Sequence, residues 1–129
     1  MKDCIPGCHK TGEHDTCGRF IGNNVGEIIH VAKRDNVEKA QLSLIPTKAQ
    51  VSEAKVWMFG AKKYGRDNWQ KGLPFLSVID SLLRHALAYK EGETHDSDTG
   101  ESHMAHVRCN AAMLIEFEST HPELDDRKK

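Results

Sequence analysis

The sequence carries almost no excess of charge of either sign. Its 18 Lys and Arg residues are balanced by 19 Asp and Glu residues, which leaves a formal net charge of −1 at pH 7. Proteins that bind nucleic acid or an anionic membrane through electrostatics have an excess of positive charge, and this chain has none. We therefore expect neither direct nucleic-acid binding nor binding to a membrane.

Long apolar runs are also missing. No segment approaches the roughly 20 apolar residues of a membrane-spanning helix, and the first residues lack the apolar core of a signal peptide. We therefore expect a cytoplasmic protein whose 4 cysteines are normally reduced. With 129 residues, of which 38% are hydrophobic and 29% charged, the chain is long enough for one compact domain with a modest core.

The pattern of apolar residues predicts a first helix over residues 47–64. Thr47 and Gln50 have the spacing of a capping box at its start. Glu53 lies at the centre of the most apolar face of this helix. A charge in such a place needs a partner, so Glu53 is a candidate metal ligand. The alternatives are a side chain that reaches solvent at the edge of the face, or an ion pair with Arg84.

Two further helices are predicted, one over residues 75–91 and one from about Ser102 to just before Pro122. The second of them contains an anomaly, because its apolar stripe includes polar side chains at His103, His106 and Asn110. An unpaired polar group in the core costs at least a few kcal/mol. Hydrogen bonds to neighbouring helices explain most single buried histidines, but three such groups beside an acidic loop favour a metal or ligand site.

The chain is expected to consist of three parts. The sequence of residues 1–35 predicts a short N-terminal arm that is irregular or contains a β-hairpin. Residues 36–122 predict a helical bundle, so the fold class is all-α. Residues 123–129 form a charged tail that we expect to be frayed.

Helices that pack as a bundle can direct their side chains into one shared pocket. Carboxylates favour Mg²⁺ and imidazoles favour Mn²⁺, Co²⁺ or Zn²⁺, so a mixed set suits Mg²⁺ or Mn²⁺, with Co²⁺ as a further candidate. The chain lacks the Gly-x4-Gly-Lys-Ser/Thr loop that cradles phosphates, so phosphate hydrolysis would depend on these metals. The predicted metal ligands are Glu53, Glu93, Asp96, His103 and His106. The predicted catalytic residues are Glu53, His85 and Arg84.

Cations and aromatic side chains near this pocket could hold a nucleotide. Lys63 and Arg84 would supply fixed positive charge for phosphates. The side chains that could stack on a base or hydrogen-bond to a base or sugar are Trp57, Tyr64, Trp69 and Asn110. Packing in the core remains the alternative role for the tryptophans, and capping of a buried carbonyl for the asparagine.

The first residues contain a cluster of soft metal ligands in a turn-rich segment, namely Cys4, Cys8, His14 and Cys17. Thiolates and an imidazole at this density could close a tetrahedral Zn²⁺ site. A flexible arm with incidental cysteines is an equally open interpretation, because the spacing is not one of the common zinc-finger patterns.

Residues from Lys39 to about Phe117 carry a set of short motifs. They are Leu-Ser-Leu-Ile-Pro at 42–46, Phe-Gly-Ala-Lys-Lys-Tyr-Gly at 59–65, Asn-Trp at 68–69, Leu-Leu-Arg-His at 82–85, Gly-Glu at 92–93, Asp96, Gly100 and His-x-x-His-x-x-Cys-Asn at 103–110. With these motifs and Glu53, the chain resembles the phage dATP/dGTP diphosphohydrolase family. That family includes the MazZ enzymes of phages that replace adenine by 2-aminoadenine.

The family is similar to MazG, so the resemblance implies the all-α NTP pyrophosphatase bundle, in which acidic pairs on two helices hold Mg²⁺. Of the first pair only Glu53 has a match in this sequence, and histidines stand where acids would sit on the last helix. The resemblance further implies cleavage of dGTP and dATP to the monophosphate plus pyrophosphate. In a 2-aminoadenine phage this reaction would supply dGMP and deplete dATP in the host cytoplasm. Such enzymes are usually homo-oligomers, so a dimer or tetramer is implied.

Two alternative functions remain open. The first is an HD-type dNTP triphosphohydrolase with His95 and Asp96 as paired metal ligands beside His85 and His106, which would release triphosphate. The second is a binding module in which the N-terminal cysteine cluster forms a zinc knuckle. The near-zero net charge argues against nucleic acid as its partner.

Overall fold

The computed structural model describes residues 30–128. The chain divides into two compact units, Met1–Lys39 and Ala40–Lys129, and each is described by itself. In the first unit, residues 30–39 contain one turn and neither a helix nor a strand. The rest of the predicted arm, including the possible hairpin and the cysteine cluster, lies outside the described residues.

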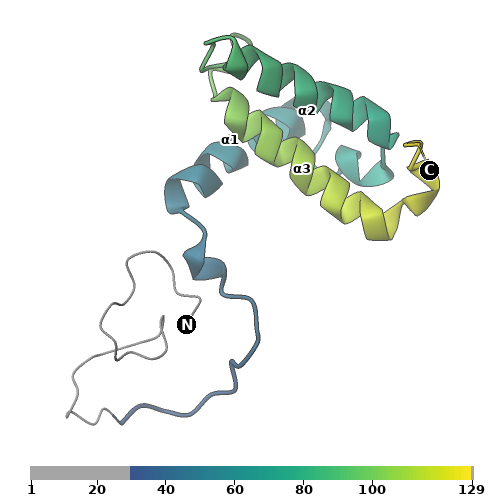
Figure 1. Cartoon of the computed structure of the whole chain (residues 1–129). Helices are drawn as coiled ribbons and strands as arrows, with labels where there is room; N and C mark the ends of the chain where they lie inside the picture. The colour runs from purple at the N-terminus through teal and green to yellow at the C-terminus, as the bar shows by residue number, and fades with distance from the viewer. Residues whose placement is uncertain (1–29, 129) are drawn as a thin grey trace. The chain divides into compact units, whose positions relative to one another are not determined.

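The first long helix, α1, spans Thr47–Tyr64, as the apolar pattern predicts (Figure 1). The predicted capping box is wrong, because Thr47 is already helical and Pro46 occupies the N-cap without a side-chain hydrogen bond. At the other end Gly65 has a φ of 103° and donates its N–H to the Ala61 carbonyl at 2.8 Å. A glycine in this left-handed region is a common helix stop.

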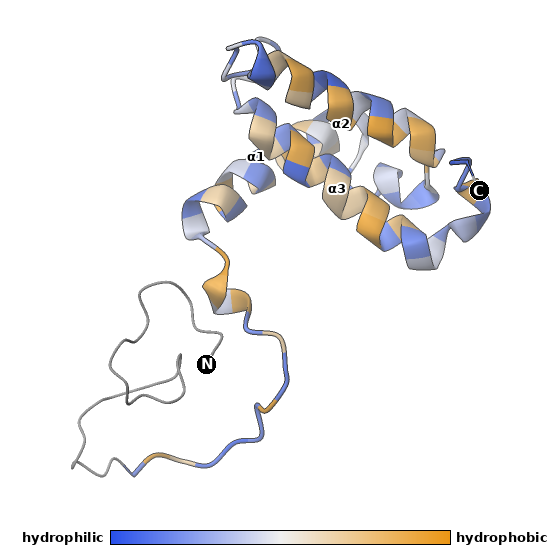
Figure 2. Cartoon of the chain, in the orientation of Figure 1, coloured by the Kyte–Doolittle hydropathy of each residue, from blue (hydrophilic) through white to orange (hydrophobic). Residues whose placement is uncertain are grey.

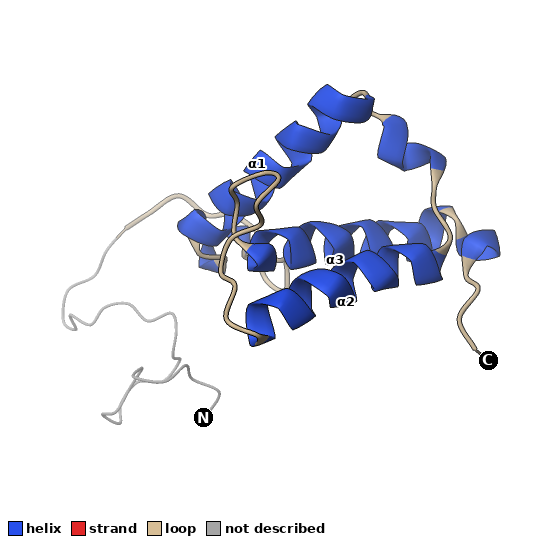
Figure 3. Ribbon diagram, turned by 90° about the horizontal axis from the view of Figure 1, so that it is seen from above, coloured by secondary structure: helices blue, strands red, loops and turns tan. Residues whose placement is uncertain are grey.

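Helices α2 (Phe75–Lys90) and α3 (His103–Thr120) run side by side in opposite directions (Figures 1 and 3). Ser102 caps α3 as predicted, because its hydroxyl oxygen accepts a hydrogen bond from the Met104 N–H at 3.1 Å. α1 packs against α3 and crosses the α2–α3 pair obliquely (Figure 3). The described residues form helices and no strand, so the expected all-α class is confirmed.

The core lies on both sides of α3. Between α1 and α3 the buried residues are Val56, Ala105 and Cys109. Between α2 and α3 they are Phe75, Val78 and Phe117. Burying each of the larger apolar side chains stabilises the fold by about 1.5–3 kcal/mol. α3 is therefore the central helix, and both of its neighbours are held in place by it.

Within the described residues there are also three short 3-10 helices, which the apolar pattern does not predict: η1 (Leu42–Leu44), η2 (Asn68–Lys71) and η3 (Pro122–Leu124). The charged tail was expected to be frayed, but residues 123–128 pack against α2. The Asp126 carboxylate accepts a hydrogen bond from the Leu76 N–H at 2.9 Å, and so caps the first turn of α2. The Arg127 guanidinium lies 5.5 Å from the centre of the Phe75 ring.

Apolar side chains remain exposed on α1 and α2. The ribbons of both helices carry apolar residues, drawn in orange, among polar ones (Figure 2). On α1 they are Val51, Met58 and Phe59. On α2 they are Leu76, Leu83 and Leu87. Within residues 30–128 no helix has the length and apolar character needed to cross a membrane. These exposed faces are therefore candidates for contact with another protein surface.

Gly72 provides a test of how closely the C-terminal turn packs. It has a φ of 93°, and a Cβ built on it would lie 2.7 Å from side-chain atoms of both His121 and Leu124. We expect Gly72→Ala to lose more stability than Gly92→Ala, because Gly92 has a similar φ of 105° but open space around it. Backbone strain should cost about 1–2 kcal/mol in both, and the clash about 1–3 kcal/mol more at Gly72. Urea unfolding measures both variants, and equal losses would show that the turn does not pack here.

Candidate metal centre

The loop that joins α2 to α3 is held by its own backbone hydrogen bonds. The Asp96 N–H donates to the Glu101 carbonyl at 2.8 Å, and the His103 N–H donates to the Thr94 carbonyl at 2.9 Å. Gly100 allows the loop to reverse its direction, because its φ of 79° lies in the region that favours glycine. The loop therefore folds back over the first turn of α3 and brings its acidic side chains to the histidines.

His85, Asp96 and His103 form a compact group of potential metal ligands. One donor atom from each lies within 4.8 Å of the others. The Nδ1 atoms of His85 and His103 are 2.9 Å apart, so one ring donates a hydrogen bond to the other, or both nitrogens face the same ion. The three residues come from α2, the loop and α3, so the group exists only when these elements are packed together.

The second ring nitrogen of His103 is buried without a hydrogen-bond partner among the described residues. The nearest acidic group is Glu93, whose Oε1 lies 3.6 Å from His103 Nε2. A histidine that binds a metal through one nitrogen usually donates its other N–H to a carboxylate. The orphaned Nε2 and the adjacent Glu93 fit that arrangement, with Nδ1 left to bind the metal.

His106 lies beside this group rather than within it. Its ring stacks on the His85 ring, with centroids 4.2 Å apart and an angle of 8° between the planes. His106 Nε2 lies 2.8 Å from Thr99 Oγ1 and 3.8 Å from Asp96 Oδ2. Thr99 also donates its N–H to Asp96 Oδ2 at 3.1 Å. Thr99 therefore connects the carboxylate to the imidazole and fixes the position of both.

The protonation states of these groups suit metal binding. Burial lowers the pKa of His85, and the neighbouring His106 adds to this shift. Burial also lowers the pKa of His106, against the opposing effect of Asp96. Burial works to raise the pKa of Asp96, but hydrogen bonds from Thr99 and the nearby imidazoles outweigh it, so this pKa lies below its usual range. Neutral imidazoles and an ionised carboxylate are the forms that bind metal ions.

The geometry of the group also fits a divalent cation. Adjacent ligands of an octahedral ion with bonds of about 2.1 Å lie about 3 Å apart. The two Nδ1 atoms of His85 and His103 have this spacing, at 2.9 Å. Two imidazoles with one carboxylate are a donor set typical of transition metals. The residues present can therefore hold a metal ion, with the carboxylate of Asp96 as the charged ligand.

The structure does not bring Glu53 into this group. Glu53 Oε1 accepts a hydrogen bond from Arg108 Nε at 3.1 Å, and Glu53 Oε2 accepts one from Trp57 Nε1 at 2.9 Å. The ion pair that was one alternative for Glu53 is thus made with Arg108 of α3 and not with Arg84. Its metal role stays a prediction.

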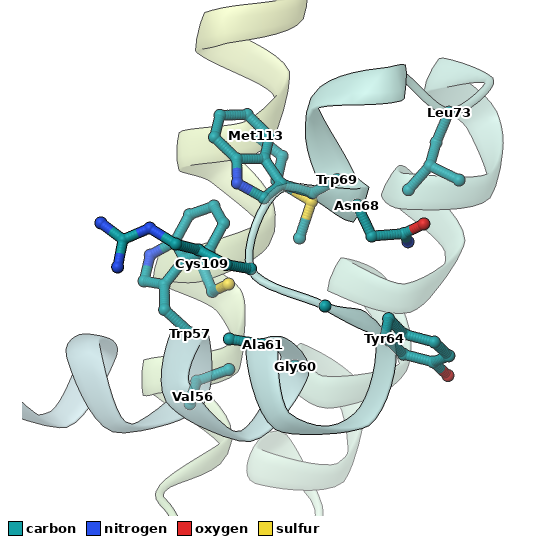
Figure 4. A pocket seen from close by; sticks show the side chains of 12 residues that line it. Val56, Trp57, Gly60, Ala61, Tyr64, Asn68, Trp69, Leu73, Cys109 and Met113 are labelled. Atoms are coloured by element: carbon teal, nitrogen blue, oxygen red, sulfur yellow. The ribbon is translucent and has the colours of Figure 1, made fainter.

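The predicted aromatic residues lie between α1 and the connection that follows it, away from the residues of the metal group (Figure 4). Trp57, Tyr64 and Trp69 line one cavity of about 370 Å³. Trp69 is half-buried rather than exposed as the loop position suggests, and its ring centre lies 5.1 Å from that of Trp57. The predicted group of aromatic side chains therefore does surround a space.

The remaining predicted residues have other surroundings. The Asn110 amide donates to the His106 carbonyl at 2.9 Å and to the Ser81 hydroxyl at 3.4 Å, so its visible role is to bridge α3 and α2. The Lys63 ammonium lies 5.2 Å from the centre of the Tyr64 ring. Arg84 is exposed on α2 beside the metal group. The cysteine cluster predicted to bind zinc lies outside the described residues.

Sequence reasoning missed Thr99, which lies beside the metal group, and Arg108, which is the partner of the predicted ligand Glu53. Thr99 had a local signal, because an Asp three residues before a Thr is typical of a side-chain-capped turn. Arg108 had none, because its partner Glu53 is 55 positions away and lies on another helix.

Comparison with known proteins places the chain in a family. A family model described as "dATP/dGTP diphosphohydrolase, N-terminal" matches residues 30–127. The chain belongs to the dATP/dGTP diphosphohydrolase family. A dATP/dGTP diphosphohydrolase of Salmonella phage PMBT28 is 37% identical to it over 90 residues. These residues are 70% of this chain and 31% of the phage protein, so the chain spans about a third of that curated relative. No solved structure matches the chain.

The assignment of the metal group can be tested by titration with Mn²⁺ in a calorimeter. We expect Asp96→Asn to weaken Mn²⁺ binding at least tenfold, because it removes the charged ligand and little volume. The matched control is His95→Ala, which alters an exposed imidazole at the adjacent position and should bind Mn²⁺ as the wild type does. If instead His95→Ala weakened binding as much as Asp96→Asn, the metal would sit on the His95–Asp96 pair of an HD-type site.

Proposed function

We propose that this chain hydrolyses dGTP and dATP to the monophosphate and pyrophosphate with the help of a divalent metal ion. The observation that carries the proposal is the His85–Asp96–His103 group in a member of the dATP/dGTP diphosphohydrolase family. The phage relative is named for dATP and dGTP, which supports purine deoxynucleotides as the substrate class.

The protein's own residues would prepare the site for this reaction. A divalent ion held by His85, Asp96 and His103 would polarise phosphate oxygens and lower the pKa of a bound water. Arg84, exposed beside His85 on α2, could bind phosphate oxygens through two parallel hydrogen bonds. Lys63, at the last turn of α1, would add a further positive charge.

The geometry also bears on the HD-type alternative. That interpretation requires His95 and Asp96 to act as paired ligands, but the His95 side chain is exposed and does not join the group that contains Asp96. The imidazoles that accompany Asp96 come from α2 and α3 instead. We therefore favour the release of pyrophosphate over the release of triphosphate.

The decisive experiment is a product assay with each dNTP in Mg²⁺ and in Mn²⁺. We expect dGTP and dATP to give dGMP and dAMP plus pyrophosphate, and we expect Asp96→Asn to lower kcat at least about 100-fold. The control His95→Ala should retain its turnover. Detection of triphosphate and free nucleoside would contradict the proposal and indicate the HD-type reaction.

We further propose that the helical domain has the bundle arrangement of MazG-type pyrophosphatases and works as a homo-oligomer, a dimer or a tetramer. The support is the exposed apolar stripe on α2, where Leu83 and Leu87 are 49% and 56% exposed one turn apart. A second copy of the chain could cover this stripe. In a phage that uses 2-aminoadenine, the enzyme would supply dGMP and deplete dATP.

The oligomer can be tested by light scattering on the eluting protein. We expect the double variant Leu83→Glu/Leu87→Glu to dissociate into monomers, because charges would replace apolar contacts at the interface. The control Ser77→Glu adds a negative charge at an exposed position of the same helix, about 100° around the helix axis from the stripe, and should leave the assembly intact. A wild-type protein that elutes as a monomer at micromolar concentration would contradict the proposal.

A further inference from the structure

The cavity on the α1 side of α3 is formed by three separate parts of the chain (Figure 4). The second half of α1 provides one wall, the connection from Gly65 to Trp69 provides another, and Cys109 and Met113 of α3 provide the floor. Its volume of about 370 Å³ lies within the range of small-molecule sites. None of the residues of the metal group lines it.

The lining is aromatic and apolar, with polar groups among its members. The Trp57 and Trp69 rings meet edge to face, with centroids 5.1 Å apart and planes at 61°. Burial raises the pKa of the Cys109 thiol to about 12, so this side chain is a neutral, weakly polar group at physiological pH. Arg66 and Asn68 add hydrogen-bonding groups. This combination of aromatic faces and a few polar groups suits a planar heteroaromatic ring.

Trp57 is held in place by a polar contact outside the cavity. Its indole N–H donates to Glu53 Oε2 at 2.9 Å, and the other carboxylate oxygen of Glu53 is held by Arg108. Trp69 in turn packs against Phe117, with ring centres 6.0 Å apart. Both tryptophans are therefore fixed by other residues, and the aromatic walls are preorganised for a ligand.

Gly60 is the residue that most directly points to an occupant. It lies in the middle of α1, where glycine is the least favourable residue apart from proline. A Cβ built on Gly60 meets no described atom within 4 Å outside the neighbouring backbone of its own helix, so protein packing does not require a glycine here. Since Gly60 lines the cavity, its missing side chain leaves space on the cavity side of the helix.

We propose that this cavity binds the nucleobase of the substrate, with the base against the tryptophans and the open face of α1 at Gly60. The inference rests on the proposed function for the identity of the ligand. α3 connects the two sites, because Cys109 lies one helical turn beyond His106 along the same helix. A nucleotide whose phosphates lie at the metal group would then extend along α3 toward the tryptophans.

The test uses the intrinsic fluorescence of the protein, because its 2 tryptophans, Trp57 and Trp69, both line the cavity. The probe is dGMP, with dCMP as the comparison, in EDTA and again with Mn²⁺. We expect saturable quenching by dGMP, and weaker quenching by dCMP because a pyrimidine offers a smaller face for stacking.

Two variants at one position then fill the cavity by different amounts. Gly60→Leu should weaken dGMP binding at least about tenfold, on the scale of one lost base–aromatic contact, and Gly60→Ala should have a smaller effect. Both should melt no lower than the wild type, since glycine is the poorer helix former. The matched control is Ala54→Leu, which places the same leucine side chain at an exposed position of α1 and should bind dGMP normally.

The outcomes separate this proposal from the proposed function. Unchanged dGMP binding by Gly60→Leu, or no quenching of the wild type with or without Mn²⁺, would overturn the cavity assignment, even if dGTP were hydrolysed. Loss of dGMP binding in Gly60→Leu with Mn²⁺ binding retained would support it, even if no dNTP were cleaved. If dGMP bound in the cavity but no dNTP were cleaved, the proposed reaction would be wrong and the base site would still be supported.

Discussion

The structure depends on how the polar groups on the buried side of α3 are satisfied. His103, His106 and Asn110 lie where apolar side chains would pack, and they are only 4%, 9% and 9% exposed. His106 is paired with Thr99 of the loop, and Asn110 with a carbonyl of its own helix and with Ser81. His103 meets His85 through one nitrogen and is left without a hydrogen bond at the other. Because most of these partners belong to α2 and to the loop, satisfying the polar groups holds both elements against α3.

α3 separates two environments of different chemistry. The side that faces α2 and the loop contains imidazoles and carboxylates, and the side that faces α1 contains sulfur atoms and indole rings. Glu53 and Arg108 join α1 to α3 at the edge of the second environment. A bound nucleotide has the same division, with charged phosphates at one end and an aromatic ring at the other. The fold therefore offers each part of such a ligand a matching surface on a single helix.

The parts of the fold that local patterns determine could be predicted from the sequence. The bounds of the helices follow from apolar periodicity and from residues such as Gly65 and Ser102, and the burial of the α3 histidines follows from their place in the stripe. Contacts between distant segments could not be predicted. Asp126 caps a helix that begins 50 positions earlier near Leu76, and Glu53 is neutralised from another helix. No local pattern encodes such pairings, because they depend on how helices are placed after packing.

The short connection between α2 and α3 has a consequence for the order in which the protein assembles. All donors of the metal group lie between His85 and His103, so their convergence requires the closure of only a short loop, whose entropic cost is small. The cavity, in contrast, requires α1 to dock on α3 from more distant positions in the chain. The helical hairpin can thus form its ligand cluster early in folding, and a metal ion bound at that stage would anchor the hairpin on which α1 later closes.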